Sequence, residues 1–151
     1  MSNRPSWDEY FMELAKTVST RATCRRRSVG AVIVRNRRIL STGYNGAPRG
    51  VPHCEEYGCD ITQRCQLAAH AEQNAIAQAA ANGVSCEGAT LYVTCQPCNA
   101  CAKLIINSGI HRVVFEGEYP DPLAIELFEF ANVELFRIEN GKLERVVEPH
   151  G

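Results

Sequence analysis

The sequence contains no long hydrophobic run, no excess of either charge and few aromatic residues. No stretch reaches the roughly 18 apolar residues that a membrane-spanning helix needs. The opening segment MSNRPSWDEY lacks the apolar core of a signal peptide. With 16 basic and 17 acidic residues, the chain has no general electrostatic attraction for DNA or RNA. We therefore expect a cytoplasmic protein with no membrane or nucleic-acid partner.

Internal repeats, low-complexity tracts and linkers are also absent from the sequence, and 151 residues fit one domain. We therefore expect a single domain over residues 1–151. Cysteine, in contrast, is abundant, with eight copies. Since no export signal accompanies them, the clustered cysteines favour metal binding over a disulfide framework.

Apolar spacing, turn residues and helix caps divide the chain into alternating elements. Ser6 and Glu9 have the spacing of a capping box, so a helix is expected from residue 6 to about residue 20. The other predicted helices are 70–81, 98–108 and 121–131, and the predicted strands are 29–34, 39–44, 89–94, 111–116, 133–138 and 143–147. Residues 45–69 are expected to form a long loop. The order αββαβαβαββ predicts an α/β fold whose later βαβ units pair in parallel, with helices on both faces.

Two short motifs carry residues suited to a catalytic zinc site. An H-x-E motif opens the helix predicted from residue 70, and a P-C-x-x-C motif opens the next helix. A catalytic zinc ion needs three protein ligands and an open position for water. Cys98 and Cys101 share one face at a helix start, where the helix dipole favours thiolates, and His70 supplies a third ligand. Glu72 follows His70 closely enough to lie beside the metal without binding it.

Neither motif is specific when it occurs alone. C-x-x-C is also found in redox and structural zinc sites, and H-x-E on a helix is often a surface accident. Together the two motifs match the signature of zinc-dependent deaminases. Such a site activates water near neutral pH for attack on an amino-bearing ring carbon, C4 of cytosine or C6 of adenine. Glu72 is expected to take the proton of the water, protonate the ring nitrogen and help ammonia leave.

Over nearly its whole length the sequence resembles the deoxycytidylate (dCMP) deaminase family of the cytidine deaminase superfamily. The zinc motif is common to many deaminases, whereas GYNGAPRG at residues 43–50 followed by HAEQNAI at residues 70–76 is typical of the dCMP branch. The opening helix with Trp7, the segments VGAVIV and LYVT, and PCNACAK belong to the same resemblance. It implies a three-layer αβα sandwich with a mixed five-stranded sheet and helices on both faces, to which this chain adds a C-terminal β-hairpin strand.

The resemblance also implies zinc-dependent hydrolysis of dCMP to dUMP and ammonia, a step that feeds thymidylate synthesis. It implies a homo-oligomer, often a hexamer, that dCTP activates and dTTP inhibits, with Mg²⁺ accompanying the triphosphate. The glycine-rich segment is expected to help bind this effector. The candidate effector residues are Gly43, Tyr44, Gly46 and Arg49.

Substrate contacts follow from the same resemblance, position by position. Asn45 is expected to contact the sugar, although a plain turn residue also fits its segment. The backbone N–H of Ala71 is expected to bind the pyrimidine carbonyl, and Tyr119 to close over the nucleotide. Arg26 is the candidate for the 5′-phosphate, with the arginine on either side of it as an alternative. An arginine run is otherwise often a solvated surface.

The remaining clustered cysteines surround the long loop. Some bacterial and phage members of the family resemble this chain and hold a second, structural zinc ion with ligands at the positions of Cys24 and Cys54. With Cys59 and Cys65 nearby in the chain, we expect a site formed by Cys24, Cys54, Cys59 and Cys65. Four thiolates would form a closed tetrahedral site, which stabilises rather than catalyses. His53 is a competing ligand, and buried free cysteines are the alternative interpretation.

Three other functions fit parts of the sequence. A tRNA adenosine deaminase shares the metal motif but is expected to carry a basic RNA-binding surface, which the net charge of −1 disfavours. A free cytidine deaminase is disfavoured because that branch usually carries another arrangement of zinc cysteines. A catalytically silent zinc-binding accessory protein of the same fold would have no chemical reason to retain Glu72.

Overall fold

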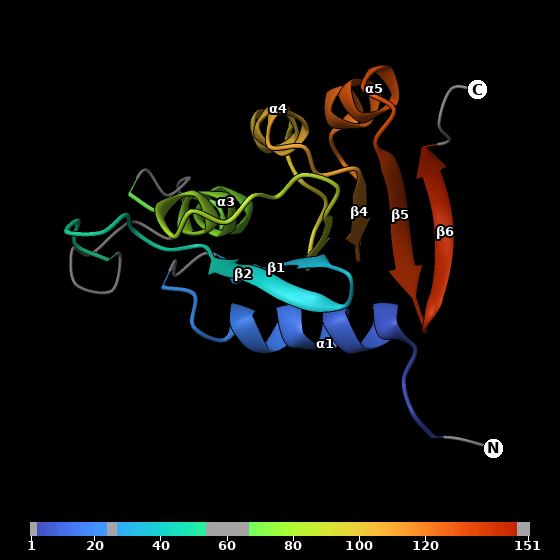
Figure 1. Ribbon diagram of the computed structural model, residues 1–151, viewed down its shortest axis with the longest axis horizontal. Coiled ribbons are helices and arrows are strands. Elements are labelled where there is room, and N and C mark those ends of the chain that lie inside the picture. Colours follow the sequence, from blue (N-terminus) through green and yellow to red (C-terminus); the bar gives the residue numbers. More distant parts are fainter. Residues whose placement is uncertain (1–2, 24–26, 54–66, 148–151) are drawn as a thin grey trace.

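A computed structural model describes residues 3–23, 27–53 and 67–147 (Figure 1). Its helices are α1 (Trp7–Ser19), α3 (Ala71–Ala81), α4 (Asn99–Asn107) and α5 (Pro122–Phe130). Its strands are β1 (Gly30–Arg35), β2 (Arg38–Tyr44), β3 (Thr90–Val93), β4 (Arg112–Phe115), β5 (Glu134–Glu139) and β6 (Lys142–Val147). Every helix and strand predicted from the sequence is present, and its ends differ from the prediction by no more than one residue.

The helices begin where their capping residues predict. The Ser6 hydroxyl accepts from the amide of Glu9 at 3.1 Å, and the Glu9 carboxylate accepts from the amide of Ser6 at 3.0 Å, which is a complete capping box. The side chain of Asp121 caps α5. His70 is the N-cap residue of α3 and Cys98 that of α4. Both halves of the zinc motif therefore lie at helix N-termini.

The strands form one mixed sheet in the order β2-β1-β3-β4-β5-β6. β3, β4 and β5 run parallel, as expected for strands joined by crossover helices. β1 is antiparallel to both β2 and β3, and β6 is antiparallel to β5. Asn140 and Gly141, both with positive φ, make the turn between β5 and β6. The predicted sheet of five strands and an added C-terminal hairpin strand is confirmed.

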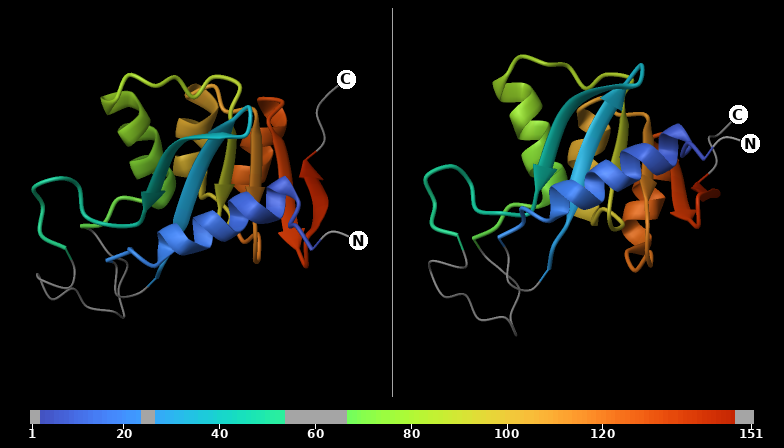
Figure 2. Two further views of the ribbon diagram at one scale, coloured as in Figure 1. Left: turned by 60° about the horizontal axis from the view of Figure 1, so that its bottom comes forward. Right: turned by 90° about the horizontal axis from the view of Figure 1, so that it is seen from below.

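Helices cover both faces of this sheet, as Figures 1 and 2 show. α1 lies on one face, where Phe11, Met12 and Ala15 pack against residues of β1, β3, β4 and β5. α3, α4 and α5 lie on the opposite face, over a core that includes Ile105 and Phe128. The predicted three-layer αβα arrangement is therefore confirmed. Among the described residues, no helix combines the length and the apolar character that crossing a membrane demands.

Candidate active site

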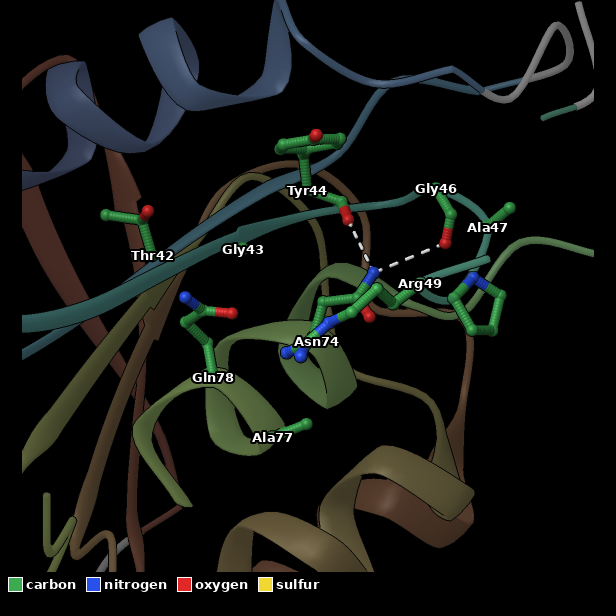
Figure 3. Close-up of a pocket in the computed structure, with 10 residues that line it drawn as sticks. Thr42, Gly43, Tyr44, Gly46, Ala47, Arg49, Asn74, Ala77 and Gln78 are labelled. Atoms are coloured by element: carbon green, nitrogen blue, oxygen red, sulfur yellow. Dashed lines mark hydrogen bonds between the residues drawn. The ribbon is translucent and has the colours of Figure 1, made fainter. Parts of the chain in front are cut away.

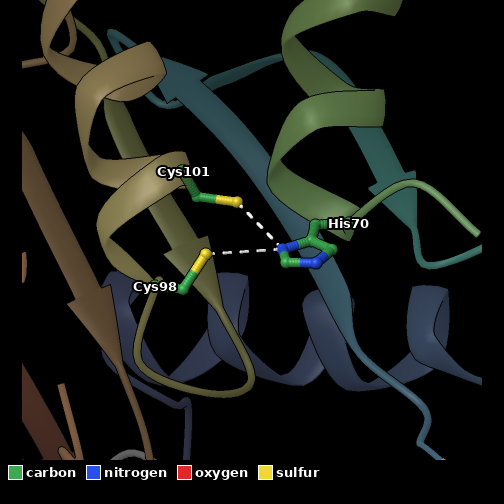
Figure 4. Close-up of side chains that lie close together, drawn as sticks. All are labelled: His70, Cys98 and Cys101. Carbon is green, nitrogen blue, oxygen red and sulfur yellow. Dashed lines mark hydrogen bonds between the residues drawn. The ribbon is translucent and has the colours of Figure 1, made fainter. Parts of the chain in front are cut away.

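The three predicted zinc ligands converge between the N-termini of α3 and α4 (Figure 4). Nδ1 of His70 lies 3.2 Å from Sγ of Cys101 and 3.5 Å from Sγ of Cys98. All three ligand atoms lie within 4.8 Å of one another. Tetrahedral zinc, with bonds of about 2.1 Å to nitrogen and about 2.3 Å to sulfur, sets nitrogen–sulfur separations of about 3.6 Å. The donor set and its spacing therefore fit zinc.

The two thiols of this triad ionise differently. Hydrogen bonds with Cys101 and His70 lower the pKa of Cys98 to about 3. The hydrogen bond with Cys98, together with burial, raises the pKa of Cys101. Ionisation of the Cys98 thiol thus opposes ionisation of the Cys101 thiol, and a divalent cation is needed to stabilise both thiolates at once. The electrostatics of the triad favour a bound cation.

Glu72 lies on the first turn of α3, and only 3% of its surface is exposed. Burial raises the pKa of its carboxyl, while a backbone hydrogen bond and the charge of His70 act in the opposite direction. Burial of this kind makes a carboxyl more ready to hold a proton, as a general acid–base group must. The placement of Glu72 beside the triad is compatible with its predicted role as a proton carrier, which stays a prediction.

A hydrogen bond to Gln73 and close packing against β2 restrain the backbone around His70. The side chain of Gln73 accepts a hydrogen bond from the amide of His70 at 2.8 Å. β2 packs directly against α3 at Gly43, where an added Cβ would clash with the carbonyl oxygen of Ala71 and the amide nitrogen of Ala75. The start of α3 therefore has little freedom to move relative to the sheet.

Asn45, predicted to contact the sugar, is 8% exposed and bonds to the backbone that leads into β1. Its Oδ1 accepts from the amide of Val29 at 2.7 Å, and its Nδ2 donates to the carbonyl of Arg27 at 2.6 Å. The second hydrogen of Nδ2 is a further donor. Asn45 therefore braces the segment 27–29, a role that sequence reasoning missed because the partners are backbone groups.

The other predicted substrate residues lie at element ends. Ala71 is the first residue of α3, where helix N–H groups lack an intrahelical acceptor. Tyr119 follows β4, is 45% exposed, and packs edge-on against Phe115 with a centroid distance of 6.3 Å. The positions of Ala71 and Tyr119 are compatible with their predicted contacts, which stay predictions.

Of the three arginines considered for the phosphate, Arg25 and Arg26 lie outside the described residues. Arg27 is described and exposed. Burial raises the pKa of the Cys95 thiol to about 12, and the positive charge of Arg27 acts against that shift. Cys95 is three residues before the zinc ligand Cys98, so the charge of Arg27 acts on a residue of the turn that leads to the site.

The four cysteines predicted to form a second zinc site, Cys24, Cys54, Cys59 and Cys65, also lie outside the described residues. Their described neighbours are informative. Oγ1 of Thr23 and Nδ1 of His53 lie 2.7 Å apart. This contact brings together the residues that immediately precede Cys24 and Cys54 in the chain.

A pocket of about 530 Å³ lies between β2 and α3 (Figure 3). All the predicted effector residues line it: Gly43, Tyr44, Gly46 and Arg49. Asn74 and Gln78 line it from α3, and Nδ2 of Asn74 donates to the carbonyls of Tyr44 at 2.8 Å and Gly46 at 3.3 Å. Sequence reasoning missed Asn74 and Gln78, although their spacing of four residues places them on one helix face.

Comparison with known proteins agrees with this geometry. The family model "Cytidine and deoxycytidylate deaminase zinc-binding region" matches residues 5–117. The ComE operon protein 2 of Bacillus subtilis is 45% identical over 138 residues, covering 90% of this chain and 73% of that protein. The deoxycytidylate deaminase of Mycobacterium phage D29 is 45% identical over 130 residues, covering 77% of this chain and 98% of that protein. The crystal structure of the dCMP deaminase from cyanophage S-TIM5, in complex with dCMP and dUMP, superposes on this structure with a TM-score of 0.81 at 32% sequence identity. The match covers 91% of this chain and 100% of the cyanophage chain.

Proposed function

Because this chain belongs to the cytidine and deoxycytidylate deaminase family, we propose that it hydrolyses dCMP to dUMP and ammonia with a zinc ion held by His70, Cys98 and Cys101. The observation that carries the proposal is the donor triad beside the buried Glu72, in a chain with several phage relatives that are named as dCMP deaminases. The name of the Bacillus subtilis relative states no activity. The retained Glu72 favours an enzyme over a silent accessory protein.

The residues of the site divide the reaction between them. Zinc, when bound by the triad, supplies Lewis-acid activation of water at neutral pH. The carboxylate of Glu72 accepts one proton of that water and delivers it to the ring nitrogen next to C4. It then takes the second proton from the oxygen now bound to C4 and passes it to the departing amine. The N–H of Ala71 donates to the pyrimidine carbonyl and orients the ring. The C4–oxygen bond forms, the C4–nitrogen bond breaks, and ammonia leaves.

Nucleotide binding is assigned to three segments around this centre. Asn45 contacts the sugar through its second amide hydrogen, and Tyr119 closes over the nucleotide. The phosphate pairs with Arg26 or with one of its neighbours Arg25 and Arg27, and the electrostatic effect of Arg27 on Cys95 supports Arg27. Separate alanine variants of the three arginines decide between them, since only loss of the phosphate ligand should raise KM for dCMP without altering KM for deoxycytidine.

Initial rates with dCMP, deoxycytidine, dCTP and an adenosine-bearing tRNA stem-loop test the proposal, and we expect the highest kcat/KM for dCMP. Glu72→Gln should retain zinc and fold but lose about 100- to 10,000-fold in turnover. A Glu72→Gln rate within tenfold of the unsubstituted protein contradicts the assigned mechanism. Deamination of the stem-loop alone would support a tRNA deaminase, and no turnover of any substrate by zinc-loaded protein would support an accessory role.

We further propose that dCTP with Mg²⁺ binds the pocket between β2 and α3 and activates the enzyme, while dTTP inhibits it. Arg49 and the exposed backbone of the glycine-rich segment would meet the triphosphate, and Asn74 links this pocket to the helix that begins after His70. A coupling of about 1–3 kcal/mol is sufficient for such regulation. The test is velocity against dCMP with and without each nucleotide in Mg²⁺, with Arg49→Gln as the insensitive variant. Velocity curves that superimpose with and without each nucleotide would contradict the proposed regulation.

A second, structural zinc ion at Cys24, Cys54, Cys59 and Cys65 is part of the proposal, supported by the contact between Thr23 and His53. Elemental analysis should find two zinc ions per chain, and Cys59→Ser should lower the count to one. A single equivalent that Cys59→Ser leaves unchanged would exclude this site. We also propose that the enzyme is a homohexamer feeding thymidylate synthesis, and sedimentation equilibrium tests its assembly.

A further inference from the structure

Four hydrogen bonds join the turn before α4 to the turn before α5. Nε2 of Gln96 donates to the carbonyl of Asp121 at 3.0 Å, and Oε1 of Gln96 accepts from the amide of Asp121 at 2.9 Å. Oδ2 of Asp121 accepts from the backbone amide of Asn99 at 2.9 Å and from its Nδ2 at 3.1 Å. Gln96 is 7% exposed, so its two bonds are shielded from water. We refer to Gln96, Asn99 and Asp121 as the turn bridge.

One carboxylate in this bridge serves two helices. Cys98 is the N-cap of α4 but makes no capping hydrogen bond, because its sulfur faces the other two zinc ligands. Oδ2 of Asp121 supplies the missing acceptor at Asn99, while its Oδ1 caps α5 at Ala124, 3.1 Å away. Burial acts to raise the pKa of Asp121, yet the hydrogen bonds from Ala124 and Asn99 lower it overall. Asp121 is therefore a carboxylate at two helix N-termini, where negative charge is favourable.

Each side of the turn bridge carries a residue of the proposed site. Cys98 lies between Gln96 and Asn99 in the chain, and Tyr119 lies two residues before Asp121. The ring of Tyr119 is half-exposed and packs edge-on against Phe115. The bridge is thus a direct mechanical link between a zinc ligand and the residue proposed to close over the nucleotide.

We propose that Asp121 is a positioning residue that holds Cys98 for zinc binding and Tyr119 for substrate closure through the turn bridge. The part of this inference that concerns the nucleotide rests on the proposed function, and the part that concerns zinc rests on the donor triad alone. Residues that orient metal ligands typically account for about 10- to 100-fold in metal affinity or activity. An effect of that size is expected here.

The primary test is Asp121→Asn in the full chain loaded with zinc. The amide keeps an oxygen that caps α5, but its nitrogen cannot accept from Asn99. α5 therefore persists and the two bonds from Asn99 are lost, while Gln96 still binds the backbone of residue 121. Release of zinc to a chelator should be about 10- to 100-fold faster. With zinc saturating, KM for dCMP should rise by a larger factor than kcat falls, because the turn that carries Tyr119 loses two of its four bonds to the start of α4, whereas Glu72 lies on α3.

Variants that remove single bonds of the turn bridge, together with a control, test the same inference. Asn99→Ala removes only the Nδ2 bond and should change zinc release in the same direction by a smaller factor. Gln96→Glu keeps an acceptor for the backbone amide of Asp121 but loses the donor to the carbonyl of Asp121. This variant replaces Asp121→Asn in the test if Asp121→Asn does not fold. Ser6→Ala is the control, because it removes an equivalent cap from α1, away from the site. It should lower the melting temperature and leave zinc release and KM unchanged.

Zinc release from Asp121→Asn or Gln96→Glu that matches the Ser6→Ala control would overturn the inference. So would a larger effect of Asn99→Ala than of Asp121→Asn. If the unsubstituted protein does not deaminate dCMP, the proposed function fails, and the ranking of zinc release rates still decides whether the turn bridge positions Cys98.

Discussion

Substitution of Gly43 by alanine should loosen the contact between β2 and α3 that supports the zinc site. The added Cβ would clash with the carbonyl oxygen of Ala71 and the amide nitrogen of Ala75, and would lie 2.9 Å from the Cα of Ala75. These are backbone atoms, so no side-chain rotation relieves the overlap and the strand must move away from the helix. Overpacking of this kind costs about 1–3 kcal/mol.

Two terms set the net size of the effect. Gly43 is not among the glycines with positive φ, so alanine fits its backbone conformation and gains about 0.4–1 kcal/mol by restricting the unfolded chain. The packing cost exceeds this gain, and we expect a net loss of about 1–2 kcal/mol in the free energy of unfolding. Because the displaced helix begins directly after His70, zinc affinity should fall as well.

The assay is urea denaturation of the zinc-loaded protein together with competitive zinc titration. Gly83→Ala is the matched control, since Gly83 has φ of +69° and no atom within 4 Å of an added Cβ. Its left-handed conformation costs alanine about 1–2 kcal/mol, a similar loss of stability without any displacement of α3. The reasoning is refuted if Gly43→Ala is as stable as the unsubstituted protein, or if both variants bind zinc equally well.

Three further predictions concern the core and the metal. The hydroxyl of Tyr92 donates to Asp8 at 2.6 Å, and burial with this bond raises its pKa above the ordinary value of 10.0. The folded state therefore keeps the proton longer than the unfolded state, so stability should fall as pH rises above 10, and denaturation curves of Tyr92→Phe should show a shallower fall after a loss of about 1 kcal/mol at neutral pH. Phe128 is fully buried, and Phe128→Ala should cost about 3–5 kcal/mol by denaturation while leaving the zinc content unchanged. Chelation should lower the melting temperature, because zinc binds the folded state, and Cys101→Ser should reduce that dependence by the share that the site of His70, Cys98 and Cys101 contributes.

The local parts of this structure are predictable from the sequence because their causes are local. The capping box of Ser6 and Glu9 starts α1, and the turn at Asn140 and Gly141 closes the final hairpin. The residues of the zinc triad are also recognisable, since each half of the motif opens a helix and a helix N-terminus presents its first side chains in one direction. The structure brings these three side chains together, as the motif predicts.

Contacts between segments distant in the chain could not be predicted in this way. Gln96 and Asp121 are 25 residues apart, and their pairing depends on how α4 and α5 lie over the sheet. The bonds of Asn45 to Arg27 and Val29 involve backbone groups, which every residue possesses and no sequence pattern marks. The same holds for Gly43, because the close approach of α3 to this position of the predicted strand leaves no mark in the sequence.

The residues proposed for the chemistry and those proposed for substrate binding come from different parts of the fold. The groups proposed to carry out the chemistry come from the first residues of α3 and α4, which the core holds rigidly, so the motif predicts hydrolytic deamination. The groups proposed to bind the nucleotide come from the connections before β1, after β2 and after β4. Connecting segments vary more than the scaffold they join. Two of them are nevertheless fixed to it, the first by Asn45 and the last by Asp121. Substitution of Asn45 or Asp121 should therefore change the selectivity for dCMP over other amino-bearing nucleotides as strongly as substitution of the residues that contact the substrate.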